Sequence, residues 1–201
     1  MKYFLLSNLW ILWCFLHSWL VTTRTTLWFR MQLGDTFAFY RIFYNLFSLI
    51  TVLPLLYWQR TIPGPMVIPL SPYLMIFKYT ALIFSLIVIA GAFVSFDIWE
   101  FIGIRHTVSG DQQKEKEPVI KKHGFYGIVR HPMYLGGIIF FTASMTHTSL
   151  PQFLGYLILA IYMIIGTVRE DRRLARELGN VYRNYQKEVP MIIPRIPGRK
   201  T

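Results

Sequence analysis

Continuous apolar stretches separated by short polar segments dominate the pattern of this chain. Five of them approach the roughly 20 residues that a helix needs to cross a bilayer; they cover about residues 3–21, 37–58, 73–96, 134–145 and 153–168. Because the runs are continuous rather than alternating, they predict helices and not the strands of a membrane barrel. The last two are short and are divided by Pro151, which predicts a tight helical hairpin. We therefore expect an all-α, polytopic membrane protein with about five transmembrane helices.

The basic residues are distributed unevenly among the connections between these runs. Six Lys and Arg lie between the third and fourth runs and nine follow Val168, whereas the turn before the fifth run has none. An excess of Lys and Arg marks the cytoplasmic side of a membrane protein. The pattern predicts that the N-terminus lies outside and the C-terminal tail inside. Residues 123–137 and the tail are then on the same face.

Composition supports the membrane assignment and narrows the partners. Hydrophobic residues make up 54% of the 201 residues and charged ones 15%, against about a quarter charged in a soluble domain. The net charge is +11, and the basic residues that cause it lie beside apolar runs. This arrangement favours anionic lipids over nucleic acid as the binding partner of the positive charge. Cys14 is the only cysteine, which excludes an internal disulfide and a cysteine-only metal cluster. We expect one domain over 1–201, with three N-terminal spans in 1–96 and a catalytic half in 97–201.

Residues 123–137 combine ionisable and small residues where the membrane is expected to meet water. Two His, one Arg and two Tyr occur within this segment, together with a Gly136-Gly137 pair. Placing polar and ionisable groups at such a border costs free energy, so these groups usually have a binding or other functional role. One interpretation is a membrane anchor, in which basic residues meet headgroups and Tyr lies in the interfacial belt. The other is a binding site, which accounts better for Gly124, His131-Pro132 and the glycine pair.

The tail carries a second group of polar residues. Glu170 and Asp171 follow the fifth run, and Gly179 is expected to cap the helix after it. Tyr182 and Tyr185 are three residues apart and share a face if the helix resumes. A solvated amphipathic helix on the membrane is the alternative for the arginine-rich part of this segment. A carboxylate at Glu170, close to a His and Tyr cluster, is expected to bind hydroxyl groups or a cation.

The motifs of these two segments occur in the order and with the spacing of a known superfamily. They read Gly124-x-Tyr126-x-x-Val129-Arg130-His131-Pro132-x-Tyr134-x-Gly136 and Glu170-Asp171-x-x-Leu174, then Leu178-Gly179-x-x-Tyr182-x-x-Tyr185 and Val189-Pro190. This C-terminal part resembles the integral-membrane methyltransferase superfamily. Its members include isoprenylcysteine carboxyl methyltransferases, phospholipid methyltransferases, NnrU-like proteins and methanethiol S-methyltransferases.

The resemblance implies S-adenosylmethionine as cofactor, held in a cytoplasmic pocket between the loop that leads into the fourth span and the tail. No Gly-x-Gly-x-x-Gly motif opens a helix after a strand, in agreement with a pocket that is not a Rossmann domain. Matched residue by residue, the resemblance assigns to the cofactor Ile120, Lys121, Tyr126, His131, Pro132, Met133, Tyr134 and Glu170. Gly124 and Gly136 are expected to let the backbone approach the ligand.

Arg130 and His131 are the candidate catalytic residues. Arg130 is expected to steady an anionic nucleophile, and lipid phosphate binding is its alternative. His131 is expected to contact the cofactor or to remove a proton. For His17, inside the first run, an interhelical hydrogen bond is favoured over a ligand role. No metal is expected, because Asp97, Glu100 and His106 do not have the spacing of a standard site.

The acceptor of the methyl group is open. In the carboxyl methyltransferases a substrate-binding Arg lies one turn before the tail Glu, and that position is Gly166 here. A thiol, an amine or a small lipophilic acid that enters from the bilayer is therefore expected, and the sequence does not indicate the oligomeric state. Two other functions stay open: a non-catalytic NnrU-like membrane protein, and a relative of the sterol reductases that binds NADPH.

Overall fold

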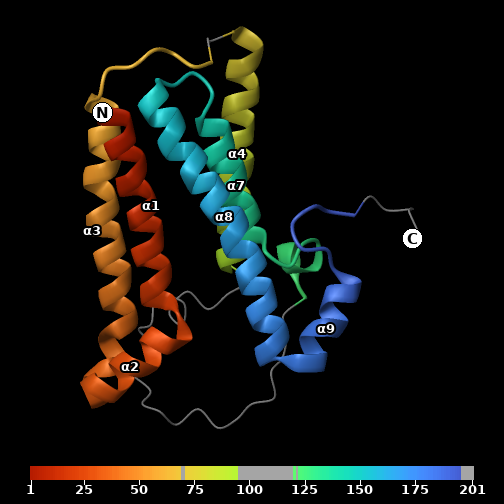
Figure 1. Cartoon of the computed structure of the whole chain (residues 1–201). Helices are drawn as coiled ribbons and strands as arrows, with labels where there is room; N and C mark the ends of the chain where they lie inside the picture. The colour runs from red at the N-terminus through yellow and green to blue at the C-terminus, as the bar shows by residue number, and fades with distance from the viewer. Residues whose placement is uncertain (69–70, 95–119, 121, 196–201) are drawn as a thin grey trace.

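The computed structural model is all-helical over the residues it describes, which are 1–68, 71–94, 120 and 122–195. The helices, in chain order, are α1 (Lys2–Val21), α2 (Thr23–Leu33), η1 (Gly34–Phe39), α3 (Tyr40–Thr61), α4 (Pro72–Val94), η2 (Gly124–Gly127), α7 (Pro132–Ser144), α8 (Leu150–Glu177) and α9 (Gly179–Glu188). Figure 1 shows α1 and α3 side by side, with α4, α7 and α8 beside them and α9 at the end of α8. The predicted fold class is confirmed.

Large apolar side chains cover the outside of the bundle. Phe4, Phe15 and Phe43, for example, are more than half exposed, and apolar surface of this extent faces lipid rather than water. Four of the described helices are long and apolar enough to cross a membrane: α1, residues 36–61 including α3, α4 and α8. The chain is an integral membrane protein.

Helix α7 is about as long as the fourth apolar run, and α8 is much longer than the fifth. With 13 residues, α7 is about 20 Å long and does not reach across the roughly 30 Å hydrocarbon core. The expected run 153–168 is part of a 28-residue helix, about 42 Å long, because the charged residues after Val168 continue the same helix. Glu170 and Asp171 are therefore positions on α8 and not the start of a separate segment.

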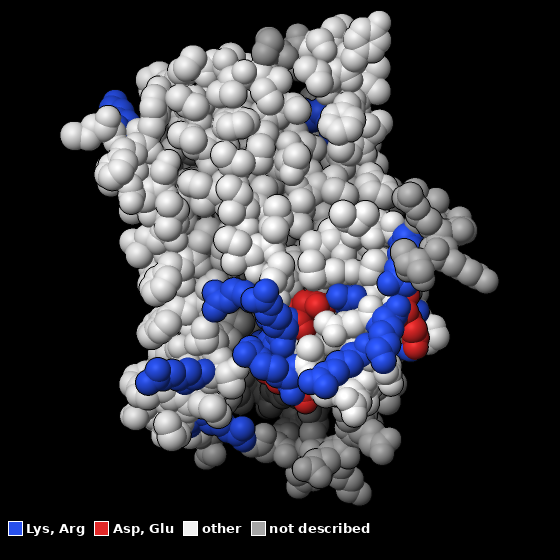
Figure 2. Space-filling view, turned by 45° about the vertical axis from the view of Figure 1, so that its right-hand side comes forward, with Lys and Arg blue, Asp and Glu red and all other residues white. Residues whose placement is uncertain are grey.

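Charged residues gather at one end of the molecule. Counted with the short α7, the helices α1, α3, α4, α7 and α8 alternate in direction, and α8 ends at the same end of the molecule as the α1–α2 junction (Figure 1). Figure 2 shows Lys, Arg, Asp and Glu concentrated around this end, while the visible surface above it is almost uncharged. We call this part of the molecule, which contains the α1–α2 junction, the last turns of α8 and α9, the charged end.

Helices α1 and α3 are joined by hydrogen bonds between polar side chains at successive levels. Trp10 Nε1 donates to Gln59 Oε1 over 3.2 Å, and Trp13 Nε1 donates to Thr51 Oγ1 over 3.0 Å. One turn further, His17 Nδ1 lies 2.8 Å from Ser48 Oγ, which confirms the interhelical hydrogen bond predicted for His17. Such bonds hold helices together where no water competes.

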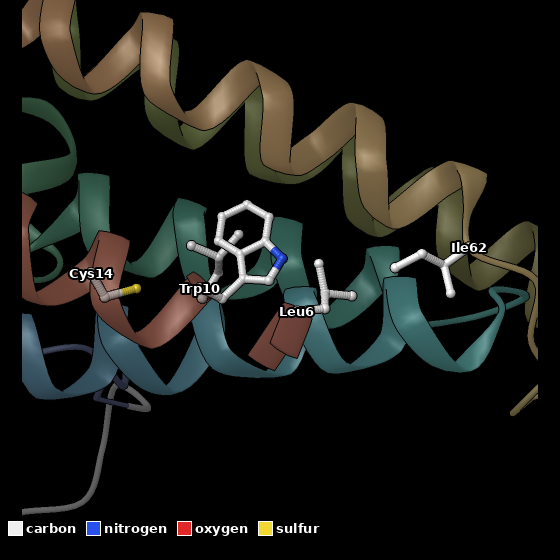
Figure 3. Close-up of a cluster of buried hydrophobic side chains, with 5 residues drawn as sticks. Leu6, Trp10, Cys14 and Ile62 are labelled. Atoms are coloured by element: carbon white, nitrogen blue, oxygen red, sulfur yellow. The ribbon is translucent and has the colours of Figure 1, made fainter. Parts of the chain in front are cut away.

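A small apolar core accompanies these hydrogen bonds. Leu6, Trp10 and Cys14 follow one another at four-residue spacing on α1, and Ile62 joins them from the end of α3 (Figure 3). Leu159 of α8 completes the cluster. Cys14 is buried and free, so its thiol has a packing role. The core fixes α1 against both α3 and α8.

Glycines allow α4, α7 and α8 to pack closely. A Cβ atom at Gly136 of α7 would lie 2.5 Å from Ile89 Cγ1 and 3.1 Å from the Ser85 carbonyl oxygen, both on α4. A Cβ atom at Gly137 would lie 2.3 Å from Met163 Cε of α8. The expectation that Gly136 lets the backbone approach a ligand is wrong, because the space beside it is filled by α4.

Candidate functional site

The carboxylate of Asp171 binds the segment before α7 to the C-terminal tail. Arg130 donates to both of its oxygens, from Nε to Oδ1 over 2.9 Å and from Nη2 to Oδ2 over 3.1 Å. His131 Nε2 lies 3.0 Å from Oδ1, and Tyr182 Oη donates to Oδ1 over 2.8 Å. Gln186 Nε2 donates to Oδ2 over 2.8 Å. A two-pronged guanidinium–carboxylate pair is among the strongest polar contacts in proteins.

These groups are almost fully removed from solvent. The side chains of Arg130, His131 and Asp171 are 8%, 5% and 12% exposed. The remaining donors of Arg130 reach the carbonyl oxygens of Gln186 and Val189 at the end of α9. A buried ion pair is stable only when further hydrogen bonds complete it, and this one is completed from three segments of the chain.

Backbone hydrogen bonds and apolar packing extend the same contact. The amides of Arg130 and His131 donate to the carbonyl oxygens of Pro190 and Met191 over 2.9 and 3.2 Å. The hydroxyl of Tyr185 donates to the carbonyl oxygen of Tyr126. Tyr182, Tyr185 and Val189 form a buried cluster; Ile120, Leu174, Ala175 and Leu178 pack against it. The predicted shared face of Tyr182 and Tyr185 is confirmed.

Burial sets the protonation of these groups. It lowers the pKa of His131 below its ordinary 6.5, although the hydrogen bond with Asp171 opposes the shift. The imidazole is therefore neutral near pH 7. Burial, with Asp171 as a second cause, raises the pKa of Tyr182. Burial also raises the pKa of Tyr126 and of Tyr185 to about 12. All three tyrosines remain protonated and able to donate hydrogen bonds.

A cavity of about 650 Å³ lies against α8 at the charged end. Its walls are residues of α1 and α2, the first turn of α7 and the C-terminal half of α8; they are His17, Ser18, Val21, Thr22, Thr23, Tyr134, Tyr162, Gly166, Arg169, Glu170, Arg172, Arg173, Arg176 and Glu177. Ligand cavities are typically about 300–1,000 Å³. This cavity is large enough for a cofactor and a small substrate.

The two faces of α8 have different partners. Tyr162, Gly166 and Arg173 line the cavity, and with about 100° per residue they lie on the side opposite Asp171. The helix therefore separates the polar cluster around Asp171 from the cavity. The pocket predicted between the loop before α7 and the tail differs from this cavity, because those two segments pack against each other and α1 and α2 supply the facing wall.

The turn between α1 and α2 shapes that facing wall. Thr22 ends α1 in an extended conformation, with φ −66° and ψ 145°. Its Oγ1 accepts a hydrogen bond from the Thr25 amide and so caps α2, as Thr commonly does at a helix start. This bend directs α2 away from α1 and leaves Val21, Thr22 and Thr23 on the cavity.

The residues that the sequence assigns to the cofactor fall into two groups. Tyr134 and Glu170 line the cavity. Ile120 packs against the tail cluster, Pro132 begins α7 as a buried residue, and His131 is bound to Asp171. Tyr126 and Met133 are half-buried outside the cavity lining. Lys121 lies outside the described residues, as do Asp97, Glu100 and His106.

Glu170 and Tyr134 have defined positions in the cavity wall. Arg173 Nη2 donates to Glu170 Oε1 over 2.6 Å. A Cβ atom at Gly166 would lie 3.1 Å from Tyr134 Cε1, so the ring of Tyr134 lies against the backbone of α8. In the described residues, no group of three His, Cys, Asp or Glu forms a metal site.

Sequence reasoning missed the part that α1 and α2 take in this cavity. The motifs that pointed to a site come from the C-terminal third of the chain. In the N-terminal part the signal is weak, because His17-Ser18 is only a polar interruption of an apolar run. The role of Asp171 was also missed, because the motif does not show that it faces away from Glu170. One residue along a helix turns a side chain by about 100°, which is the reason for the separation.

The fold and the cavity define a polytopic helical membrane protein with a ligand-sized site at its charged end. Residues 80–181 match the phospholipid methyltransferase family. The chain belongs to this family, and the match includes α7, all of α8 and the segment before α7 that Asp171 binds. No solved structure matches the chain.

Similar curated proteins share one name. A methanethiol S-methyltransferase of a Pseudomonas species is 35% identical over 102 residues, which are 48% of this chain and 37% of that protein. Methanethiol S-methyltransferase 1 of Bradyrhizobium diazoefficiens is 29% identical over 184 residues, 89% of this chain and 62% of that protein. A methanethiol S-methyltransferase of Mycobacterium tuberculosis is 32% identical over 101 residues, which are 48% of this chain and 39% of that protein. The chain thus spans 37% to 62% of the length of these relatives.

Proposed function

We propose that this protein is a methyltransferase that uses S-adenosylmethionine to methylate a small thiol at the membrane. The observation that carries the proposal is the joint placement of Tyr134 and Glu170 in one cavity at the charged end. They come from the motifs that resemble the superfamily's cofactor-binding residues, and both lie in the stretch that matches the family. Membership of the family and the names of the relatives support the same reaction.

The residues of the cavity fit this cofactor. The Glu170 carboxylate is suited to accept hydrogen bonds from ribose hydroxyls or an ammonium group. The Tyr134 ring offers a π face to a sulfonium cation, a contact of about 0.5–2 kcal/mol. Arg173 Nε is buried without a hydrogen-bond acceptor, although Glu177 Oε1 lies 3.8 Å away, and an oxygen of the cofactor's carboxylate would supply that acceptor. When bound, the sulfonium supplies an activated methyl group, so the protein has chiefly to position the acceptor and exclude water.

Several features favour a small thiol as the acceptor. The relatives are named methanethiol S-methyltransferases. Gly166 stands where the carboxyl methyltransferases carry their substrate-binding Arg, and here Tyr134 occupies the space beside it. A second cavity of about 160 Å³ shares Ser18, Tyr162 and Gly166 with the main one and continues past Phe15 and Ile165. Because these two side chains are exposed on the lipid-facing surface, we propose that an apolar acceptor enters here from the bilayer.

The charged end is assigned to the cytoplasmic side, with the N-terminus outside. The support is the excess of Lys and Arg at this end and the general rule that such an excess is cytoplasmic. The arginines on the last turns of α8 are expected to contact anionic lipid headgroups as well.

Arg130 and His131 are proposed to act on the site indirectly. Both are bound to Asp171, and neither lines the cavity. Their contacts hold α9 and the start of α7, and thereby fix the first turn that carries Tyr134. Direct catalysis by either residue stays a prediction.

The test is methyl transfer from methyl-labelled S-adenosylmethionine by purified protein in detergent, with methanethiol, a prenylated cysteine and phosphatidylethanolamine as acceptors. The proposal expects label in dimethyl sulfide alone. Label in the prenylated cysteine or in phosphatidylethanolamine would support a methyltransferase but contradict the thiol as its acceptor. A folded protein that transfers no methyl group and does not bind the cofactor would favour a non-catalytic protein. NADPH binding in its place would favour a reductase relative.

A further inference from the structure

His17 is placed in the wall of the cavity by three neighbours. It lies on α1, and its ring stacks on Trp13 with the centroids 5.2 Å apart and an interplanar angle of 8°. The edge of Tyr162 meets it from α8, with the centroids 6.2 Å apart. Together with Ser18, whose hydroxyl lies 3.0 Å from that of Tyr162, it faces the same cavity as Tyr134 and Glu170.

The hydrogen bonds of Ser48 fix the tautomer of His17. The Ser48 hydroxyl donates its one proton to the carbonyl oxygen of Tyr44 over 2.7 Å. It must therefore accept from His17 Nδ1, which lies 2.8 Å away. A neutral imidazole that carries its proton on Nδ1 has an unprotonated Nε2, which is a hydrogen-bond acceptor and a base.

The Nε2 atom belongs to a side chain that lines the cavity. Within the described part of the chain, Nε2 has no hydrogen-bond partner, and it is not among the enclosed side-chain atoms that lack one. His131 differs, because its Nε2 is directed to Asp171. The other described histidines, His123 and His147, do not line the cavity. Among described residues, His17 is thus the imidazole with a free nitrogen at this site.

From this arrangement we propose that His17 is the general base of the methyl transfer, an inference that rests on the proposed function. As the acceptor sulfur attacks the methyl carbon, its S–H proton passes to His17 Nε2. The new bond joins sulfur to the methyl carbon, and the bond between that carbon and the sulfonium breaks, its electron pair remaining on the departing sulfur. The products are the methyl thioether, S-adenosylhomocysteine and a protonated His17, which returns its proton to water at the charged end.

Other ionisable groups surround His17. Cys14 is on the same helix, Tyr44 on α3 and Tyr134 on α7. On α8 the facing groups are Tyr162, Arg169, Glu170 and Arg173. A loss of rate at low pH can therefore be assigned to His17 only by comparing the pH–rate profile of wild type with that of a His17 variant.

His17→Asn tests the proposal, because the amide nitrogen of Asn replaces the Nδ1 donor to Ser48 but supplies no base. Thr51→Val is the matched control, since it removes the neighbouring α1–α3 hydrogen bond from Trp13 at a position outside the cavity. The measurements are kcat/KM for a small thiol from about pH 6 to 9.5, calorimetric binding of S-adenosylhomocysteine and the thermal midpoint. The pH range begins below the ordinary pKa of imidazole and passes that of a cysteine thiol.

We expect His17→Asn to lower kcat/KM about 100-fold or more at pH 7. The deficit should shrink as the pH approaches the thiol's own pKa, where the acceptor is already ionised. Binding of S-adenosylhomocysteine and the thermal midpoint should match those of Thr51→Val. Equal pH profiles for His17→Asn and wild type, in a wild type that methylates the thiol, would overturn the role of His17 alone. Failure of wild type to bind or methylate would instead overturn the proposed function.

Discussion

Asp171 is the single side chain on which the contact between the tail and the rest of the molecule most depends. Four side chains bind it: Arg130, His131, Tyr182 and Gln186. Loss of one partner in a buried ion pair leaves the other charge unpaired, which typically costs about 3–5 kcal/mol. An exposed pair contributes only about 0–1 kcal/mol.

Asp171→Asn should therefore lower the free energy of unfolding in detergent by about 3–5 kcal/mol and expose residues after 178 to proteolysis. Glu188→Gln is the control, because it breaks the exposed pair with Lys122 and should cost no more than about 1 kcal/mol. Equal losses for the two variants would show that Asp171 does not hold the tail.

The lowered pKa of His131 predicts a stability that depends on pH. Below about 6.5 the unfolded chain takes up a proton at this residue while the folded chain, with its lower pKa, does not. Stability from this group is thus complete above pH 6.5 and decreases as the pH falls toward the folded pKa. Between about pH 7.5 and 5.5 the thermal midpoint of wild type should fall more than that of His131→Asn, whose amide still donates to Asp171. Parallel curves would contradict the shift.

At the residue scale, the sequence indicated which side chains gather at one end of the molecule more readily than what those side chains contact. The motifs singled out Arg130, His131, Tyr134 and Glu170, and the structure brings all four to the charged end. Their division between two faces of α8 depends on a helix that continues past Val168. A run of charged residues after an apolar one does not show whether the helix ends or extends.

At the scale of elements, the pairing of α4 with α7 depends on the missing side chain of Gly136. A Cβ atom at this position would lie 2.5 Å from Ile89 and 3.1 Å from the backbone of Ser85, and backbone cannot move aside easily. Close approach at small residues is the usual basis of helix packing in membranes. The sequence showed the glycine but not its neighbour, because nothing in a single apolar run identifies the helix opposite.

Gly136→Val should destabilise the protein by about 1–3 kcal/mol, as overpacked sites do, and should reduce cofactor binding by displacing the first turn of α7. The measurements are unfolding in detergent and calorimetry. Ala90→Val is the control, because it also enlarges a small residue but at an exposed, lipid-facing position of α4. This variant should behave as wild type. A stable Gly136→Val protein would contradict the packing described for α4 and α7.

At the scale of the whole molecule, two parts of the chain that differ in their sequence signals build one site. The C-terminal part supplies Tyr134 and Glu170 and carries the family motifs. The N-terminal part supplies the facing wall at His17 and Thr22, with apolar helices whose order the sequence predicted. The cavity itself was not predictable, because it arises from the bend at Thr22 and the length of α8, neither of which a hydropathy pattern defines.

The central claim is that Glu170 and the cavity around it bind the methyl donor. Calorimetric titration of S-adenosylhomocysteine into detergent-purified protein tests it, with wild type, Glu170→Ala and Glu188→Ala compared at one pH. We predict binding by wild type and Glu188→Ala, and binding weakened at least tenfold in Glu170→Ala, a loss of about 1.4 kcal/mol or more. Unchanged affinity in Glu170→Ala, or no binding by folded wild type, would contradict the account.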